Sequence, residues 1–217
     1  MPTKRLLDLF CGVGGTAMGY HQAGFAEIVG VDIKPMPRYP FTFVQANALD
    51  YGAQHGKDFD VIHASPPCQK FSAISRVMKG RPIQHQYQDL ISPIRSLLIA
   101  WGGVYVIENV VGAPLLNPVM LCGSMFDLKL PGRGYLRRHR LFESNFPLKV
   151  EMVCTHRGKA MGVFGHGGSG RHGTWGVSVE AAAARELMGI SWANRNEVAQ
   201  AIPPAFTNYF GRQILAR

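Results

Sequence analysis

The sequence contains no apolar run approaching the roughly 20 residues that a membrane-spanning helix requires. Its opening residues, MPTKRLLDLF, also lack the longer apolar stretch and small-residue cleavage site of a secretory signal. Hydrophobic residues make up 47% and charged residues 17% of the 217 positions, so the chain should fold, and its length suits one domain. We therefore expect a soluble, cytoplasmic protein with a single domain over residues 1–217.

Cysteines are few and widely spaced. The chain holds four of them, Cys11, Cys68, Cys122 and Cys154. None forms a Cys-x-x-Cys pair, so the spacing indicates neither a zinc ribbon nor a disulfide framework. A further group could in principle gather a metal: Cys154, His156, His166 and His172. Because this spacing fits no usual zinc finger, we interpret these four as polar loop residues and expect no bound metal.

Acidic residues are also scarce, since 14 Asp and Glu stand against 23 Lys and Arg, for a formal charge of +9. The basic residues concentrate in two segments. Between positions 129 and 171 nine Lys and Arg outnumber two acids, and between positions 70 and 81 four basic residues occur without an acid. Such patches suit a polyanion such as nucleic acid, although a generically basic surface would give the same composition.

The first half of the chain alternates short apolar segments with segments of helical spacing. The predicted strands are residues 5–10, 27–33, 41–46, 59–64 and 104–108. The predicted helices run from the first glycine turn to about residue 23, over residues 89–101 and 179–188, and from residue 204 to about 215. This alternation predicts an α/β fold with a parallel sheet covered on both faces. Residues 140–142 predict a further strand, and the glycine-rich residues 157–176 predict a loop.

A glycine-rich turn, DLFCGVGG at residues 8–15, follows the first predicted strand and opens a helix. Glycines let a backbone approach a ligand closely, and a helix N-terminus faces it at a switch point of the sheet. Asp32 ends the second strand, where it is placed to bind ribose hydroxyls. The pattern predicts a nucleoside cofactor without separating a nicotinamide from S-adenosylmethionine (SAM), and a tight turn without a ligand remains the alternative.

The segment SPPCQKFS, residues 65–72, places Cys68 after two prolines at the end of a buried strand. Prolines restrict the backbone, so the cysteine should be held rigidly at the carboxyl edge of the sheet. Partial exposure, the start of a helix and nearby Lys70 would favour the nucleophilic thiolate. A buried structural cysteine is the alternative for this motif taken alone.

Two further motifs carry charged groups toward the same region. Glu108 ends the fifth strand, where burial would raise its pKa and let it protonate a substrate, although a solvated loop carboxylate is commoner. In LRRHRLF, Arg138 and Arg140 alternate along an extended segment and share one face. Two guanidinium groups on one face suit phosphate and carbonyl oxygens, and a solvated edge strand is the alternative.

In this order, the segments resemble the cytosine-5 DNA methyltransferase family over residues 8–213. The glycine turn and helix, DLFCGVGGTAMGYHQAGF, are similar to the family's SAM-binding opening, and VDIKP to its ribose-binding acid. SPPCQKFS resembles the Pro-Cys-Gln nucleophile motif, ENV the Glu-Asn-Val motif, RHR the Arg-x-Arg motif, and AQAIPPAF the late motif that closes the SAM site. The resemblance is to a compact member with a minimal target-recognition region.

The resemblance implies a Rossmann-like, SAM-dependent methyltransferase fold with SAM as the cofactor. Phe10 would pack against the adenine, Asp32 would bind the ribose and Pro67 would shape the pocket. The implied cofactor-binding residues are Asp8, Phe10, Gly12, Gly14, Gly15, Asp32, Ile33, Asn47, Ala48, Pro67, Gln200 and Ala201. The sequence departs from the family where Asn47 replaces an Asp that binds the adenine amino group, where Leu136 replaces Gln, and where Gln200 replaces Asn. The Asn47 amide oxygen could still accept a hydrogen bond.

The resemblance also implies catalytic roles for Cys68, Glu108, Arg138 and Arg140. Cys68 would add to ring carbon 6 of a cytosine flipped out of the helix, and Glu108 would protonate ring nitrogen 3. Carbon 5 would then take the methyl group. Arg140 would hold the base carbonyl, and Arg138 would support phosphate or the loop.

Double-stranded DNA is the implied partner, in the cytoplasm of a prokaryotic or phage-infected cell. A target-recognition segment has room only at about residues 143–177, and we expect no obligate protein partner, although one supplying target recognition remains open. The predicted DNA contacts are Gln69, Lys70, Ser72, Arg76, Lys79, Arg81, Arg137, Arg157 and Arg171. The alternatives are a tRNA cytosine-5 methyltransferase, a non-catalytic regulatory relative and a nicotinamide dehydrogenase. The absence of a Gly-x-Gly-x-x-Gly motif argues against the dehydrogenase.

Overall fold

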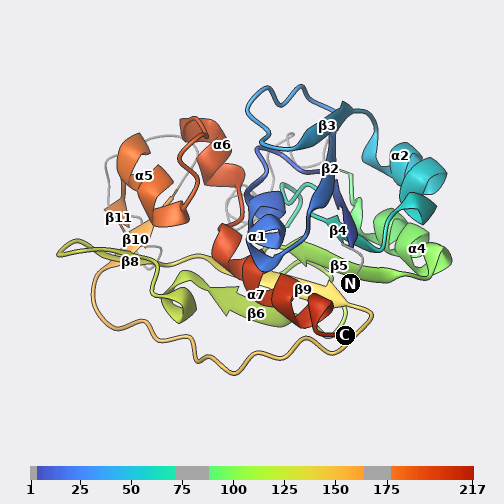
Figure 1. Ribbon diagram of the computed structural model, residues 1–217. Helices are drawn as coiled ribbons and strands as arrows, with labels where there is room; N and C mark the ends of the chain where they lie inside the picture. The colour runs from blue at the N-terminus through green and yellow to red at the C-terminus, as the bar shows by residue number, and fades with distance from the viewer. Residues whose placement is uncertain (1–3, 72–87, 164–176) are drawn as a thin grey trace.

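A seven-stranded sheet forms the centre of the computed structural model, which describes residues 4–71, 88–163 and 177–217 (Figure 1). The strand order is β3-β2-β1-β4-β5-β9-β6. The bounds are β1 (Arg5–Leu9), β2 (Glu27–Asp32), β3 (Thr42–Gln45), β4 (Val61–Ala64), β5 (Val104–Asn109), β6 (Val119–Cys122) and β9 (His139–Ser144). Neighbouring strands from β3 to β5 pair in parallel, whereas β9 pairs antiparallel with both β5 and β6. The predicted Rossmann-like fold with a mostly parallel sheet is confirmed.

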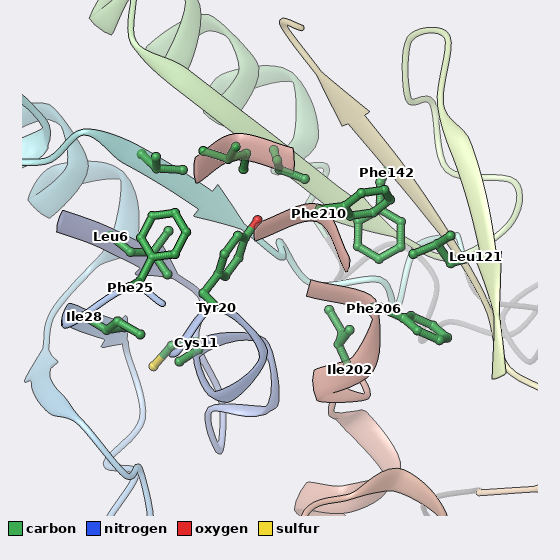
Figure 2. Packing of buried hydrophobic residues seen from close by; sticks show 14 of the residues in the cluster. Leu6, Cys11, Tyr20, Phe25, Ile28, Leu121, Phe142, Ile202, Phe206 and Phe210 are labelled. Atoms are coloured by element: carbon green, nitrogen blue, oxygen red, sulfur yellow. The ribbon is translucent and has the colours of Figure 1, made fainter. Parts of the chain in front are cut away.

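Helices cover both faces of this sheet because successive strand residues point to opposite sides. Leu6 of β1 belongs to the core beneath α1 (Gly15–Ala23) and α7 (Pro204–Leu215). Leu7 belongs to the core beneath α2 (Ala48–His55) and α4 (Ile91–Trp101). Figure 2 shows the first core, with Tyr20 and Phe25 at one end and aromatic residues of α7 at the other. The described chain has no helix that is long and apolar enough to cross a membrane.

A second, four-stranded sheet lies beside the first and was not expected from the sequence. Its order is β11-β10-β8-β7, with β7 (Lys129–Leu130), β8 (Gly134–Leu136), β10 (Ala160–Gly162) and β11 (Val177–Ser178). Helices α5 (Ala181–Met188) and α6 (Arg195–Gln200) share its core, and the 3-10 helices η1 (Gly56–Asp58) and η3 (Gly123–Phe126) complete the described elements.

The prediction of a loop over residues 157–176 is wrong for β10. Met161 pairs with Leu136 and is buried, so a contact between distant segments decides this strand. No local period could reveal such a pairing in a glycine-rich stretch. Residues 164–176 lie outside the described residues.

A buried ion pair fixes β9 against the helix layer. Arg95 of α4 lies with its Nε 2.7 Å from Glu143 Oε1 and its Nη2 2.7 Å from Oε2. Glu143 is 3% exposed and also accepts a hydrogen bond from the backbone N–H of Leu116. Such a bidentate pair has well-defined geometry, so it positions the strand that carries Arg140 near its start.

Candidate active site

The carboxyl edge of the parallel strands brings the motif residues together. Parallel strands all end at the same edge, so the segments after β1, β2, β4 and β5 meet there. Strand β9 runs in the opposite direction, and its register pairs Phe142 with Glu108 and Leu141 with Asn109. The start of β9, with Arg140, therefore lies beside the end of β5.

Glu108 is a buried carboxyl group with one oxygen that is not hydrogen-bonded. The Nε atom of Arg140 lies 3.0 Å from Glu108 Oε1, but the contact lacks hydrogen-bond geometry. Among the described residues, no donor satisfies this oxygen. Burial raises the pKa of Glu108. The positive charges of Arg140 and Arg138 and a hydrogen bond with Ser65 lower it, but by less than burial raises it. The raised pKa favours the protonated carboxyl more than in an exposed glutamate, and the unsatisfied oxygen can accept a hydrogen bond from a ligand.

A line of hydrogen bonds reaches Glu108 from the interior. Tyr20 Oη lies 3.0 Å from His63 Nδ1, His63 Nε2 lies 3.1 Å from Ser65 Oγ, and Ser65 bonds to Glu108. Burial lowers the pKa of His63 to about 3, so the ring is neutral. When Glu108 is ionised, each donor is assigned: Ser65 donates to the carboxylate, Nε2–H to Ser65, and Tyr20 to Nδ1. Sequence reasoning missed this network because only the folded chain brings Tyr20 to His63 and Ser65 to Glu108.

Cys68 lies in the segment after β4, which a hydrogen bond holds in place. Asn109 Nδ2 donates to the backbone oxygen of Pro66 over 2.9 Å, so the Glu-Asn-Val segment positions the cysteine loop. Phe71 N–H donates to the Cys68 carbonyl over 2.9 Å. Asn109 is thus a positioning residue that the sequence did not single out.

Cys68 is partly exposed, as expected, but its surroundings do not on balance favour the thiolate. Burial raises the pKa of the Cys68 thiol and outweighs the lowering by Arg140. Residues 69–71 form a turn, and residues 72–87, where a helix was expected to start, lie outside the described residues. The ammonium of exposed Lys70 lies 6.0 Å from the Phe71 ring centre. Arg140, from a distant strand, is therefore the main cation acting on Cys68.

Arg138 is buried and points to backbone oxygens. Its Nη2 donates to the carbonyls of Ala199 and Ala201 over 2.8 and 2.7 Å, and its Nη1 to that of Val163 over 3.3 Å. These contacts join β9 to the end of α6. Of the two roles predicted for Arg138, they favour support of the loop over contact with phosphate.

The glycine turn forms an open cradle at the end of β1. Gly12 N–H donates to Asp32 Oδ2 over 3.1 Å, and Lys34 N–H donates to Oδ1 over 3.0 Å. Gly12 has φ 49°, and a Cβ there would meet nothing within 4 Å, so its outer side is accessible to a ligand. A Cβ at Gly15 would lie 2.3 Å from the Ile202 carbonyl oxygen, so the late motif packs directly on the start of α1.

Other predicted cofactor residues differ in their surroundings. Ile33 is 67% exposed beside Asp32, Phe10 is half-buried with φ 60°, and Asp8 is completely buried. Burial raises the pKa of Asp8 well above its ordinary value, and its nearest side-chain partner is Tyr39, at 3.5 Å. Asp8 therefore lies beneath the turn. The remaining predicted residues differ in burial: Gly14 and Ala48 are buried, Ala201 is half-buried, and Pro67 and Gln200 are exposed.

The Asn47 amide oxygen, predicted to be able to accept a hydrogen bond from the cofactor, already accepts hydrogen bonds within the fold. Asn47 is the N-cap of α2, and its Oδ1 accepts hydrogen bonds from Leu49 N–H at 2.9 Å and Asp50 N–H at 3.4 Å. Capping uses both lone pairs of the oxygen, as expected for Asn before a helix.

Two contacts that no motif indicated hold the late segment over the turn. Trp192 Nε1 donates to the Val13 carbonyl over 2.8 Å. Arg38 forms a bidentate pair with Glu197, with distances of 2.9 and 2.7 Å. Both contacts join residues more than 150 positions apart, so local patterns carry no signal for them.

The predicted DNA-contacting residues are only partly described. Gln69, Lys70 and Arg157 are exposed, and Arg137 is half-buried with its backbone N–H donating to Met161. The others, Ser72, Arg76, Lys79, Arg81 and Arg171, lie outside the described residues.

Cys154 and His156 lie in a loop, as interpreted, but they meet two residues that the sequence did not group with them. Their donor atoms converge with those of Cys122 and His139, all within 4.8 Å of one another. The expected companions His166 and His172 lie outside the described residues. Sequence spacing missed the grouping because strand pairing supplies two of its four members.

Comparison with known families and proteins identifies what the chain resembles. The family model for C-5 cytosine-specific DNA methylase matches residues 4–113, just over half of the 217 residues. The matched stretch includes the glycine turn, Asp32, Cys68 and Glu108.

Curated relatives agree with this match, and a solved structure shares the fold. The type II methyltransferase M1.HphI of Haemophilus parahaemolyticus is 30% identical over 124 residues, covering 48% of this chain and 32% of that protein. The type II methyltransferase M.XorII of Xanthomonas oryzae pv. oryzae is 31% identical over 122 residues, covering 49% and 28%. The matches thus span about a third of these relatives' length. The S. pombe Dnmt2 methyltransferase structure has a TM-score of 0.64 over 99% of both chains at 13% identity, a likeness of fold.

Proposed function

Because the chain belongs to the C-5 cytosine-specific DNA methylase family, we propose that it transfers a methyl group from SAM to carbon 5 of cytosine in double-stranded DNA. The observation that carries the proposal is the buried Glu108 carboxyl, which has one unsatisfied oxygen. Glu108 and Arg140 both lie close enough to Cys68 for their charges to shift its pKa. A nucleophile, a proton donor and a cation thus share one edge of the sheet, as acid-assisted addition to a heterocycle requires.

The chemistry follows from these three groups. The Cys68 thiolate forms a bond to carbon 6 of a cytosine flipped out of the duplex. Glu108 gives a proton to ring nitrogen 3, and the electron pair displaced from the 5,6 double bond makes carbon 5 nucleophilic. After carbon 5 is methylated, it gives up its proton to water, which restores the 5,6 double bond and expels the Cys68 thiolate. Nitrogen 3 then returns its proton to Glu108. Arg140 holds the base carbonyl and opposes the effect of burial on the thiol pKa.

The residues at the glycine turn fit SAM. The open side of Gly12 admits the ligand against the backbone, Asp32 offers carboxylate oxygens for ribose hydroxyls, and exposed Ile33 offers an apolar surface to adenine. Bound SAM supplies the electrophilic methyl group. Arg138 and Trp192 keep the late segment and the turn in place around this site.

Target recognition is proposed to be short. One catalytic domain spans residues 1–217, with a reduced recognition segment at about 143–177, of which residues 143–163 and 177 are described. Exposed Lys70 and Arg157 would meet phosphates. Bisulfite sequencing of fully modified DNA tests this, and a strict six-base-pair recognition site would contradict it.

Covalent trapping tests the proposed reaction. Duplex DNA containing 5-fluorocytosine is incubated with SAM and either wild-type protein or Cys68→Ser, and adducts are located by mass spectrometry. We expect an adduct at Cys68 that is absent from the variant, because fluorine at carbon 5 prevents the final elimination. Methyl transfer by Cys68→Ser would disprove the mechanism. An adduct formed on tRNA containing 5-fluorocytosine but not on duplex DNA would assign an RNA substrate instead.

A further inference from the structure

Four side chains with metal-binding atoms converge where β6 ends and β9 begins. Cys122, His139, Cys154 and His156 each bring one donor atom to a space where all four lie within 4.8 Å of one another. We propose that these residues bind one zinc ion in a tetrahedral site. The site is distinct from the carboxyl groups and glycine turn of the proposed active site, and its evidence does not depend on the proposed reaction.

The measured separations between donor atoms lie within a few tenths of an ångström of the edges of a zinc tetrahedron. Zinc–sulfur and zinc–nitrogen bonds of about 2.3 and 2.0–2.1 Å place ligand atoms roughly 3.3–3.8 Å apart. His156 Nε2 lies 3.6 Å from Cys122 Sγ, 3.0 Å from Cys154 Sγ and 3.1 Å from His139 Nε2. His139 Nε2 lies 3.4 Å from Cys154 Sγ. Small shifts of these side chains complete the geometry.

Hydrogen bonds alone account poorly for this arrangement. His156 Nε2 faces three acceptor-capable atoms, those of Cys122, His139 and Cys154, yet can carry only one proton. A bound cation accounts better for four donor atoms that converge on one point, because each would direct a lone pair toward it. Two thiolates and two imidazoles form an S₂N₂ set, which selects zinc among common metals when the site is tetrahedral.

The fold brings these ligands together in two steps. Antiparallel pairing of β6 and β9 places Cys122 directly opposite His139. The connection from β9 to β10 then returns past β6 and supplies Cys154 and His156 (Figure 1). Neighbouring groups orient the ligands: the Tyr135 ring stacks on His156 at 11°, and Ser124 Oγ lies 3.7 Å from Cys154 Sγ.

Because all four positions are filled by protein, the zinc is structural. It attaches the connection between β9 and β10 to the main sheet. The same connection is tied to α7 through Lys149, whose backbone N–H donates to Gln213 Oε1. His139 also links the zinc to the proposed active site, since its carbonyl oxygen accepts a hydrogen bond from Arg140 Nη1 over 2.9 Å.

Metal content and cobalt spectra test the site directly. Wild-type protein, His156→Ala and Cys154→Ser are reconstituted with zinc, desalted and analysed for metal per chain. We expect one zinc per wild-type chain and loss of it from both variants. His55→Ala, which removes an exposed histidine of α2, is the matched control and should keep its zinc. Cobalt in place of zinc should give the visible bands of a tetrahedral ion and a thiolate charge-transfer band.

Thermal unfolding supplies a second readout that does not involve methyl transfer. A chelator should lower the unfolding midpoint of the wild type by about 5–10 °C, as expected for a ligand held near 100 times its dissociation constant, and should not change that of His156→Ala. The proposal is overturned if the wild type binds no more zinc than His156→Ala. It is equally overturned if the purified protein contains a Cys122–Cys154 disulfide, or if cobalt gives an octahedral spectrum.

Discussion

Arg140 Nε lies 3.0 Å from Glu108 Oε1 without forming a hydrogen bond to it. The cation limits the rise in the Glu108 pKa that burial causes, yet leaves the oxygen able to interact with a substrate. The same guanidinium offsets part of the rise in the Cys68 pKa that burial causes. One residue therefore adjusts both the acid and the nucleophile of the proposed reaction, and its position depends on the register between β5 and β9.

Glu108→Gln should slow methyl transfer by roughly a hundredfold or more, because an amide cannot supply the proton that general acid catalysis requires. Single-turnover transfer of a labelled methyl group measures the effect. SAM binding by calorimetry is the control and should remain unchanged, since the cofactor residues lie at other strand ends. Transfer near the wild-type rate would remove Glu108 from its proposed role.

Alkylation of Cys68 in the free protein should accelerate with pH up to and beyond the ordinary thiol range. Burial raises the Cys68 pKa, so the thiolate fraction is small at neutral pH. Iodoacetamide labelling followed by peptide mass spectrometry measures the rate at each pH. Arg140→Gln should move the profile to still higher pH, because it removes the largest lowering influence. A plateau below the ordinary thiol pKa would show that the thiol is activated.

Stability should fall as the pH drops below about 6.5, because His63 is buried in its neutral form. Burial lowers its pKa to about 3, so between this value and the unfolded value of 6.5 the unfolded chain binds more protons. The expected loss approaches about 1.4 kcal/mol per pH unit in that interval. Denaturant unfolding from pH 7 to 5 measures it. His63→Gln should reduce the slope and His55→Gln should not; equal slopes in all three proteins would contradict the assignment.

Glu143→Gln should lower the free energy of unfolding by about 3–5 kcal/mol, because it leaves Arg95 without its buried carboxylate. The acid is 3% exposed and makes three short contacts with Arg95 and Leu116. Urea unfolding monitored by circular dichroism gives the free energy. Lys129→Gln breaks an exposed ion pair with Asp127 and serves as the control. Similar small effects of both substitutions would show that the Arg95 pair contributes little.

Binding to duplex DNA should weaken steeply as salt increases, because lysines and arginines release counterions from phosphates. Lys70→Ala should lower the affinity and reduce the slope of log affinity against log salt by about one. Lys57→Ala is the matched control, since this exposed lysine precedes β4 at the opposite edge of the sheet. A salt response identical in the wild type and Lys70→Ala would place the DNA elsewhere.

Local patterns were enough to predict the frame of the molecule. Apolar runs predicted β1 to β5, and the residues that end those strands, among them Asp32 and Glu108, had to meet at one edge because parallel strands share their direction. The Pro-Pro-Cys and Glu-Asn-Val segments were visible for the same reason. Each is a short run of chain whose position in the fold follows from the strand before it.

Contacts between distant segments decided the rest. The Cys68 pKa rises because the folded chain buries the thiol, and Asn47 caps a helix that the sequence did not predict. Arg138 finds its acceptors more than 20 residues away, and Cys122 meets His156 only after β6 pairs with β9. Sequence alone determined which chemical groups stand at the ends of the strands. Burial, strand register and the path of the connection between β9 and β10 are properties of the folded chain. They decided which of those groups are in contact and how they ionise.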